Sequence, residues 1–202
     1  MIKTKKDLHF FLNEDRIRNR VSKNLIINII RRFMREEHVC VYRYIWNLRH
    51  CEYHYNNSKN SLYHKLLFFY YKIRLSRLGS KFNISIKLNS CGYGLRLMHL
   101  SGGGGVRIGA KKVGNYCGFN AGVLIGQKDN DDNRPVIGDH VGFGPGSKAF
   151  GKLFIGNNVF VAPNAVVTKD VPDNCIVGGI PAKILKQREY HPLDSIDSQR
   201  KD

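Results

Sequence analysis

The C-terminal half of the chain repeats an apolar residue at every sixth position. Nine positions fall on one such frame: Val113, Phe119, Ile125, Ile137, Phe143, Ala149, Ile155, Val161 and Val167. A helix repeats its apolar face about every 3.6 residues and a strand every second residue, so neither element produces this period. A fixed short period is typical of a repeat architecture. Three hexapeptides, each a short strand and a corner, predict one triangular coil whose apolar residues point inward. Strands of a sandwich would recur nearer every ten residues, with alternating polarity.

The N-terminal part lacks this period and shows helical spacing instead. Apolar stripes predict helices within 22–38, 41–55 and 61–79, with Ser22 as an N-cap, Ser61 before the last helix and Gly79 after its end. The stripes are basic as well as apolar, so two interpretations are open. One is a membrane-surface segment facing acidic headgroups. The other, which the usual role of such stripes favours, is a small helical domain packed on the repeats or on copies of them.

Two segments interrupt the hexapeptide frame. The first contains four consecutive glycines, 102–105, and the second, "IGQKDNDDNRPVIG", would place Asp131 in the interior of the coil. Burying an unpaired carboxylate is too costly, so residues 127–135 are predicted to leave the wall as an exposed loop. Both interruptions belong to the same or neighbouring coils, which predicts a pocket there.

The charge of the chain narrows the choice of partners. The net charge is +17, and residues 1–80 hold 17 basic against 6 acidic side chains. Such a field favours anionic partners, but no nucleic-acid motif and no zinc-ligand spacing is present, so neither nucleic acid nor a metal is expected. Five scattered cysteines indicate a reducing compartment, and no apolar run reaches the roughly 20 residues of a spanning helix. A cytoplasmic protein is predicted.

The last repeats carry a family resemblance. The stretch "IGDHVGFGPGSKAFGKLFIGNNVFVAPNAVVTKDVPDNCIVGGIPAKILK", with its "VVTKDVP" and "GGIPAKI" motifs, resembles the hexapeptide-repeat acyltransferases, in particular the serine acetyltransferase and polysaccharide O-acetyltransferase branch. The resemblance implies a mainly β fold, a left-handed parallel β-helix after an α-helical domain, acting as a homotrimer or dimer of trimers with acetyl-CoA. The expected domains are a helical oligomerisation domain over 1–79, the β-helix over 80–187 and a flexible tail over 188–202.

One histidine falls on the family's catalytic segment. An isolated histidine on a wall is more often structural, but "GYGLRLMHLSG" resembles the segment with the catalytic histidine, which implies that His99 is the general base. Moving an acetyl group from a thioester to a hydroxyl needs such a base. The glycines at 102–105 offer either backbone N–H groups for the oxyanion or simple turn flexibility.

The resemblance also implies an acetyl-CoA site. By position, the groove for the pantetheine arm and the nucleotide end involve Gly144, Pro145, Ala162, Pro163, Thr168, Lys169 and Lys183. Small residues permit close passage of a thin chain. The alternative is that Gly, Ala and Pro serve the corners of the coil and that both lysines are solvated.

The acceptor side departs from serine acetyltransferases. Met98 stands where they have an acidic residue, their "D-x-H-P" element falls near Ile84 and Ile86, and Arg134 replaces their second active-site histidine. Arg134 suits an anionic or polyhydroxylated acceptor. The predicted acceptor is therefore a sugar or polysaccharide-precursor hydroxyl.

On this interpretation, Arg134 and the acidic pair Asp131 and Asp132 form the substrate side of the site. Serine is the alternative acceptor. Two other classes are a non-catalytic β-helix assembly protein, without CoA affinity, and a metal-dependent hydratase. The hydratase needs three histidines at one interface, whereas only His99 and His140 lie in the repeats.

Overall fold

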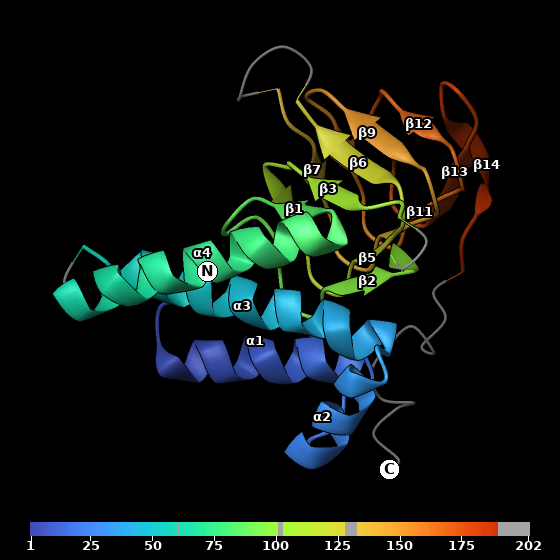
Figure 1. Ribbon diagram of the computed structural model, residues 1–202. Helices are drawn as coiled ribbons and strands as arrows, with labels where there is room; N and C mark the ends of the chain where they lie inside the picture. The colour runs from blue at the N-terminus through green and yellow to red at the C-terminus, as the bar shows by residue number, and fades with distance from the viewer. Residues whose placement is uncertain (60, 101–102, 128–132, 190–202) are drawn as a thin grey trace.

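A computed structural model describes residues 1–59, 61–100, 103–127 and 133–189. Four helices come first: α1 (Lys5–Arg18), α2 (Leu25–Phe33), α3 (Glu37–Asn57) and α4 (Leu62–Phe82). A stack of short strands follows, and Figure 1 shows the helices at one end of this stack. Within the described residues, no helix is long and apolar enough to cross a membrane.

Three sheets form the walls of the β-helix. The first contains β1 (Ile84–Ile86), β3 (Val106–Ile108), β6 (Val123–Gly126), β9 (Lys148–Phe150) and β12 (Val166–Val167). The second contains β4 (Lys112–Val113), β7 (Val136–Ile137) and β10 (Phe154–Ile155). The third contains β2 (Arg96–Met98), β5 (Gly118–Asn120), β8 (Gly142–Phe143), β11 (Phe160–Val161), β13 (Cys175–Gly178) and β14 (Lys183–Gln187). All pairs are parallel except β13 with β14.

The hexapeptide frame is the core of this stack. Each of the nine residues on the frame is no more than 2% exposed. The register stacks like on like: Phe119 pairs with Phe143 and Phe143 with Val161, and the two phenylalanine rings stack at 5.2 Å. The parallel β-helix is therefore confirmed. The period is six because each hexapeptide supplies one wall strand and one corner, and three of them close a coil.

The strand register on either side of the second interruption leaves room for the predicted loop. Val113 pairs with Ile137, and Ile137 pairs with Ile155. The first step spans six residues more than the second, so the segment between β6 and β7 adds length without adding a wall strand. Residues 128–132 lie outside the described residues.

The helix ends differ from the predicted ones. Asn24, not Ser22, caps α2: its side chain accepts hydrogen bonds from the backbone N–H of Ile26 and Ile27. Helix α4 does not stop at Gly79 but continues to Phe82 and ends at Asn83, whose φ is +54°. Asparagine tolerates this left-handed conformation, and its carbonyl accepts from Val106 N at 2.9 Å, which joins the helices to the repeats.

A buried ion-pair cluster joins α1 and α3 to the first coil. Arg49 of α3 is fully buried and contacts Asp15 of α1 at 2.8 Å and Glu52 at 3.1 Å. Its guanidinium also donates to the carbonyls of Cys91 and Gly92. Burial alone would lower the pKa of Arg49, but the two carboxylates outweigh burial and raise it. The guanidinium therefore stays charged and saturated with acceptors.

Removing Arg49 should unfold this junction. The Arg49→Met variant leaves the carboxylates of Asp15 and Glu52 buried without their cation, a loss of about 3–5 kcal/mol in the free energy of unfolding. The measurement is denaturant unfolding. Arg43→Met on the exposed side of the same helix is the matched control and should change stability by no more than about 0.5 kcal/mol. Equal stability of the two variants would contradict the role given to the cluster.

The α3–α4 hairpin should lose stability in acid. His50 stacks on Tyr71 at 5.0 Å, and burial, with His54 nearby, lowers the pKa of His50 to about 4. Because the unfolded chain takes up this proton near its ordinary pKa of about 6.5, stability is present above that pH and is lost as the pH falls towards 4. Thermal midpoints measured across this range should fall for the wild type and fall less for His50→Phe. Identical pH slopes would contradict the assignment.

Candidate active site

His99 lies at a corner of the coil, directly after β2. Its φ is +59°, a left-handed conformation that non-glycine residues adopt at tight turns, and its side chain is exposed. The next residue, Leu100, is buried, and its N–H donates to the Glu37 carboxylate at 2.6 Å. The residue after His99 is thus fixed twice, by burial of its side chain and by the hydrogen bond of its N–H to a carboxylate at the start of α3.

A cavity of about 350 Å³ opens beside this corner. Its lining comes from β2 and from the two ends of the segment that carries α2, and comprises Asn19, Arg20, Glu37, His38, Arg96, Leu97, Met98 and His99. Sequence reasoning missed its helical-domain residues, because no spacing along the chain relates 19–20 or 37–38 to position 99. Half of the lining comes from the residues just after α1 and from the start of α3. Of the first interruption, Gly104 and Gly105 line a different cavity, which α4 and the first sheet enclose.

The cavity is strongly basic on one side. Burial, together with the positive charges of Arg18 and Arg20, lowers the pKa of Arg96. Arg96 also lines a neighbouring cavity of about 180 Å³ on the outer face of the third sheet, together with Arg18, His140 and Arg188. Two cavities that share Arg96 and are lined by further arginines suit a ligand that carries negative charge.

The glycine run is shaped by the turn itself. Gly103 and Gly105 have positive φ, and a Cβ on Gly105 would meet the Asn83 carbonyl oxygen at 2.5 Å. Gly103 N donates to Leu100 O at 3.2 Å, which closes the turn after His99. Gly102 lies outside the described residues. These contacts account for glycine by turn geometry, and the oxyanion role stays a prediction.

The predicted pantetheine residues gather at one corner of successive coils. A Cβ on Gly144 would meet Pro163 N at 2.7 Å, so the stacking of coils itself requires a glycine there. Gly144 N donates to Val161 O, and Ala162 N donates to Val177 O, which carries the same stacking one coil further. Pro145 and Pro163 are exposed on the outer surface of this corner.

The residues predicted for the nucleotide end lie at the far end of the stack. Thr168 and Lys169 follow β12, Lys183 begins β14, and all three side chains are exposed. Of the predicted acceptor residues, Asp131 and Asp132 lie outside the described residues. Arg134 is partly buried and donates from Nη1 to the Gly109 carbonyl at 2.9 Å.

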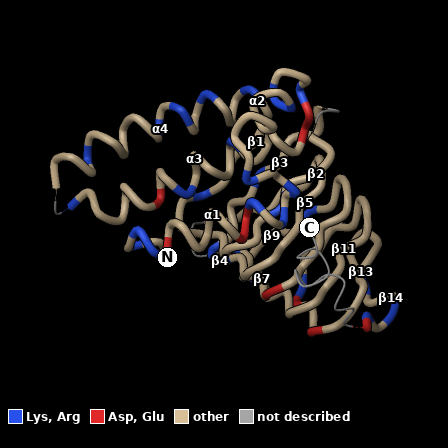
Figure 2. Tube along the Cα trace, turned by 90° about the horizontal axis from the view of Figure 1, so that it is seen from below, with Lys and Arg blue, Asp and Glu red and all other residues tan. Residues whose placement is uncertain are grey.

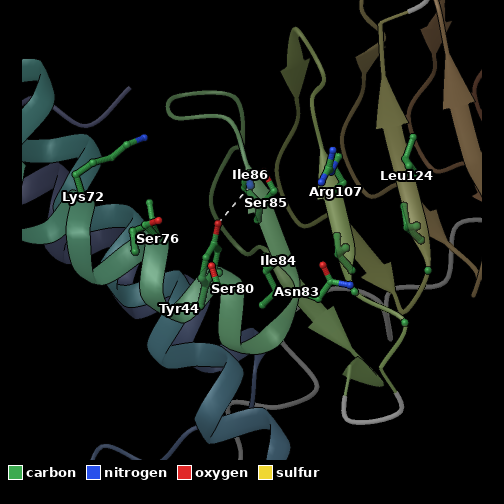
Figure 3. A pocket seen from close by; sticks show the side chains of 17 residues that line it. Tyr44, Lys72, Ser76, Ser80, Asn83, Ile84, Ser85, Ile86, Arg107 and Leu124 are labelled. Atoms are coloured by element: carbon green, nitrogen blue, oxygen red, sulfur yellow. Dashed lines mark hydrogen bonds between the residues drawn. The ribbon is translucent and has the colours of Figure 1, made fainter.

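A larger cavity, of about 560 Å³, lies away from His99. It is enclosed by α4 and the first sheet, and Figure 3 shows Lys72 and Ser76 of α4 across from Arg107 of β3. Tyr44 closes its floor by accepting the Ile86 N–H at 3.2 Å, and burial raises the pKa of Tyr44. The "D-x-H-P" positions are occupied by Ile84 and Ile86, whose side chains are buried in the core. Because both are isoleucines, neither position supplies a carboxylate or an imidazole.

No group of three or more His, Cys, Asp or Glu side chains that can hold a metal occurs in the part of the chain that the structure describes. The five cysteines are all unpaired.

The fold is a parallel β-helix with a hexapeptide repeat, and comparisons with known proteins show what it is similar to. No family model matches the chain. The chain is 37% identical over 108 residues to serine acetyltransferase of Synechococcus elongatus, covering 51% of this chain and 43% of that protein. It is 33% identical over 96 residues to serine acetyltransferase of Mycobacterium tuberculosis, covering 46% and 42%. The chain thus spans less than half the length of these curated relatives.

Solved structures show the same fold over nearly the whole chain. Serine acetyltransferase from Brucella abortus strain S19 matches with a TM-score of 0.65 at 21% identity, covering 92% of this chain and 71% of that one. The same enzyme in complex with coenzyme A matches with a TM-score of 0.63 at 21% identity, covering 93% and 71%. Neisseria gonorrhoeae serine acetyltransferase in complex with serine gives 0.62 at 22% identity, covering 90% and 70%. The resemblance to serine acetyltransferases read from the sequence is confirmed.

Gly144→Ala should strain the stack, because the new methyl group meets the backbone of Pro163. We expect a loss of about 1–3 kcal/mol, measured by thermal or denaturant unfolding. Gly118→Ala in β5 is the control, since its Cβ would meet only the Met98 side chain at 3.5 Å. A fully stable Gly144→Ala protein that loses CoA affinity would instead show that Gly144 serves the ligand.

Proposed function

We propose that this chain is an acetyl-CoA-dependent O-acetyltransferase with His99 as general base. The observation that carries the proposal is the position of His99. It stands on an exposed corner, beside a basic cavity, in a β-helix whose curated relatives are named serine acetyltransferases.

The proposed chemistry is direct transfer. The imidazole of His99 accepts the proton of the acceptor hydroxyl while its oxygen attacks the thioester carbonyl. The C–O bond forms, the C–S bond breaks, and the proton passes to the departing CoA thiolate. No covalent enzyme intermediate is needed. Glu37 is a positioning residue: its carboxylate accepts a hydrogen bond from Leu100 N and so fixes the residue that follows His99.

Acetyl-CoA is the proposed donor. The Brucella neighbour was solved with coenzyme A, which supports a CoA site in this fold. Arg18, Arg20 and Arg96 supply positive charge near His99 for a phosphorylated ligand. The proposal keeps Gly144, Pro145, Ala162, Pro163, Thr168, Lys169 and Lys183 as the CoA side, with Gly144 and Ala162 also serving coil stacking.

Serine is the acceptor that the relatives favour over the saccharide expected from the sequence. The curated relatives carry the name serine acetyltransferase, and the Neisseria structure contains serine. One observation speaks for a second acceptor: Met98, which lines the cavity beside His99, is apolar where the family resemblance implies an acidic residue. A saccharide hydroxyl therefore stays the second candidate.

The organisation of the whole protein is part of the proposal. We propose that the helices, which end at Phe82 rather than at the expected residue 79, form an oligomerisation domain and that the repeats up to residue 187 form the acetyltransferase domain, acting as a homotrimer or dimer of trimers in the cytoplasm. Five unpaired thiols suit a reducing compartment. The tail over 188–202 lies outside the described residues except for Arg188 and Glu189.

The direct test is release of free CoA thiol from acetyl-CoA by the purified protein. His99→Asn should lower kcat/KM about a hundredfold or more, because a positioned general base contributes at least that factor. Asparagine tolerates the left-handed backbone of this corner, so the variant should keep its stability. His9→Asn, at an exposed position of α1 that lines neither cavity near His99, should keep wild-type activity.

The acceptor is resolved in the same assay with serine and a panel of sugars offered separately. Thiol release that requires serine supports the serine acetyltransferase activity, and release with a sugar alone supports the second candidate. Full activity of His99→Asn would contradict the assigned base. The absence of release with every acceptor would contradict the enzyme proposal and favour an assembly role.

A further inference from the structure

Helix α2 presents its apolar face to solvent. Seven apolar side chains of this segment are exposed: Leu25, Ile26, Ile27, Ile29, Ile30, Phe33 and Met34, with Phe33 at 89%. At about 100° per residue they cover more than half of the helix circumference. No residue of α2 is buried. This reverses the usual arrangement, in which the apolar stripe of an amphipathic helix faces the protein core, and of the two packing partners expected from the sequence it excludes the repeats of the same chain.

The polar arc of α2 contacts the segments that directly flank the helix. Asn28 donates through its side chain to the Ser22 carbonyl at 2.8 Å, and Arg31 pairs with Glu36 at 3.7 Å. Glu36 also lies 3.4 Å from His38. The contacts of the polar side are thus with the flanking segments, and the apolar side is the exposed one. Figure 1 shows α2 set away from the β-helix, beyond α1 and α3.

The segment around this helix is purely basic. Residues 16–35 contain seven Lys and Arg and no Asp or Glu. Lys23, Arg32 and Arg35 are exposed beside the apolar face, and Figure 2 shows basic positions on both sides of α2 along the chain. An apolar helix face flanked by exposed cations matches an anionic lipid surface, where the apolar side chains enter the acyl boundary and the cations meet headgroups.

We propose that α2 docks this protein on the surface of an acidic phospholipid bilayer. A second copy of the chain is the competing occupant; the bilayer fits better because exposed Lys23, Arg32 and Arg35 flank the apolar face, and the same face of a copy would bring like charges together there. The helix has nine residues, about 14 Å at 1.5 Å per residue, so it lies on the bilayer rather than crossing it.

The docking helix is tied to the candidate active site at both ends. Arg20 precedes α2, Glu37 follows it, and both line the cavity beside His99. A bilayer that holds α2 therefore holds the mouth of this cavity close to the membrane surface. The docking proposal does not depend on the acetyltransferase proposal, because it is tested by binding alone.

The test is co-sedimentation of the full chain with phospholipid vesicles. Wild-type protein should bind vesicles that contain phosphatidylglycerol, bind phosphatidylcholine vesicles weakly, and lose binding as salt is raised. A triple variant should lower the partition coefficient more than about tenfold; its changes are Ile26→Gln, Ile30→Gln and Phe33→Gln. Complete burial of one such apolar side chain in the bilayer corresponds to about a tenfold change in partition. Glutamine keeps helix propensity, and circular dichroism checks the fold.

The matched control is Leu66→Gln with Ile73→Gln on the exposed face of α4. It should bind vesicles like the wild type. Multi-angle light scattering of wild type and the α2 variant gives the oligomer mass of each. Equal masses with lost vesicle binding support the proposal. The proposal is overturned if the wild type does not bind anionic vesicles, whether or not the α2 variant loses an oligomer contact. It is also overturned if only the α4 variant loses binding.

Discussion

The buried guanidinium of Arg49 is the contact on which the site depends. It pairs with Asp15 of α1 and Glu52 of α3 and donates to the Cys91 and Gly92 carbonyls of the first coil. Asp15 in turn accepts from Leu95 N, and Glu52 accepts from Asn89 N. Three elements far apart in sequence thus share one network of charged hydrogen bonds, which is costly to form and costlier to break.

That network sets the geometry around His99. The end of α1 and the start of α3 reach β2 only because α1 and α3 are fixed against the first coil. Asn19 extends the junction by donating to the Leu95 carbonyl at 2.8 Å, one residue before Arg96. The corner histidine, the Glu37 hydrogen bond and the basic cavity are therefore products of the joint between helices and repeats, not of the β-helix alone.

The β-helix could be predicted because its constraint is local and repeated. Every sixth side chain must fit the interior of the coil, so Val113, Phe143 and Val167 show their role in the spacing alone. The helical domain gives a weaker signal. The position of Asn24 as a cap, or of Asn83 as the end of α4, depends on hydrogen bonds that several nearby polar residues could make equally well.

The candidate site was predictable only in part, for the same reason. His99 was found through a motif within one coil, whereas Arg20 and Glu37 reach it by tertiary packing that leaves no pattern along the chain. The sequence left the exposure of α2 open, because an apolar stripe at helical spacing looks the same in sequence whether it faces a core or solvent.

The central claim is that this β-helix serves acetyl-CoA. Isothermal titration calorimetry of the full wild-type chain with coenzyme A tests it without any choice of acceptor. We predict saturable binding that weakens as salt is raised, because the ligand phosphates meet arginine and lysine side chains. Titration with no heat of binding at any salt concentration would contradict the account and leave the repeats as a scaffold.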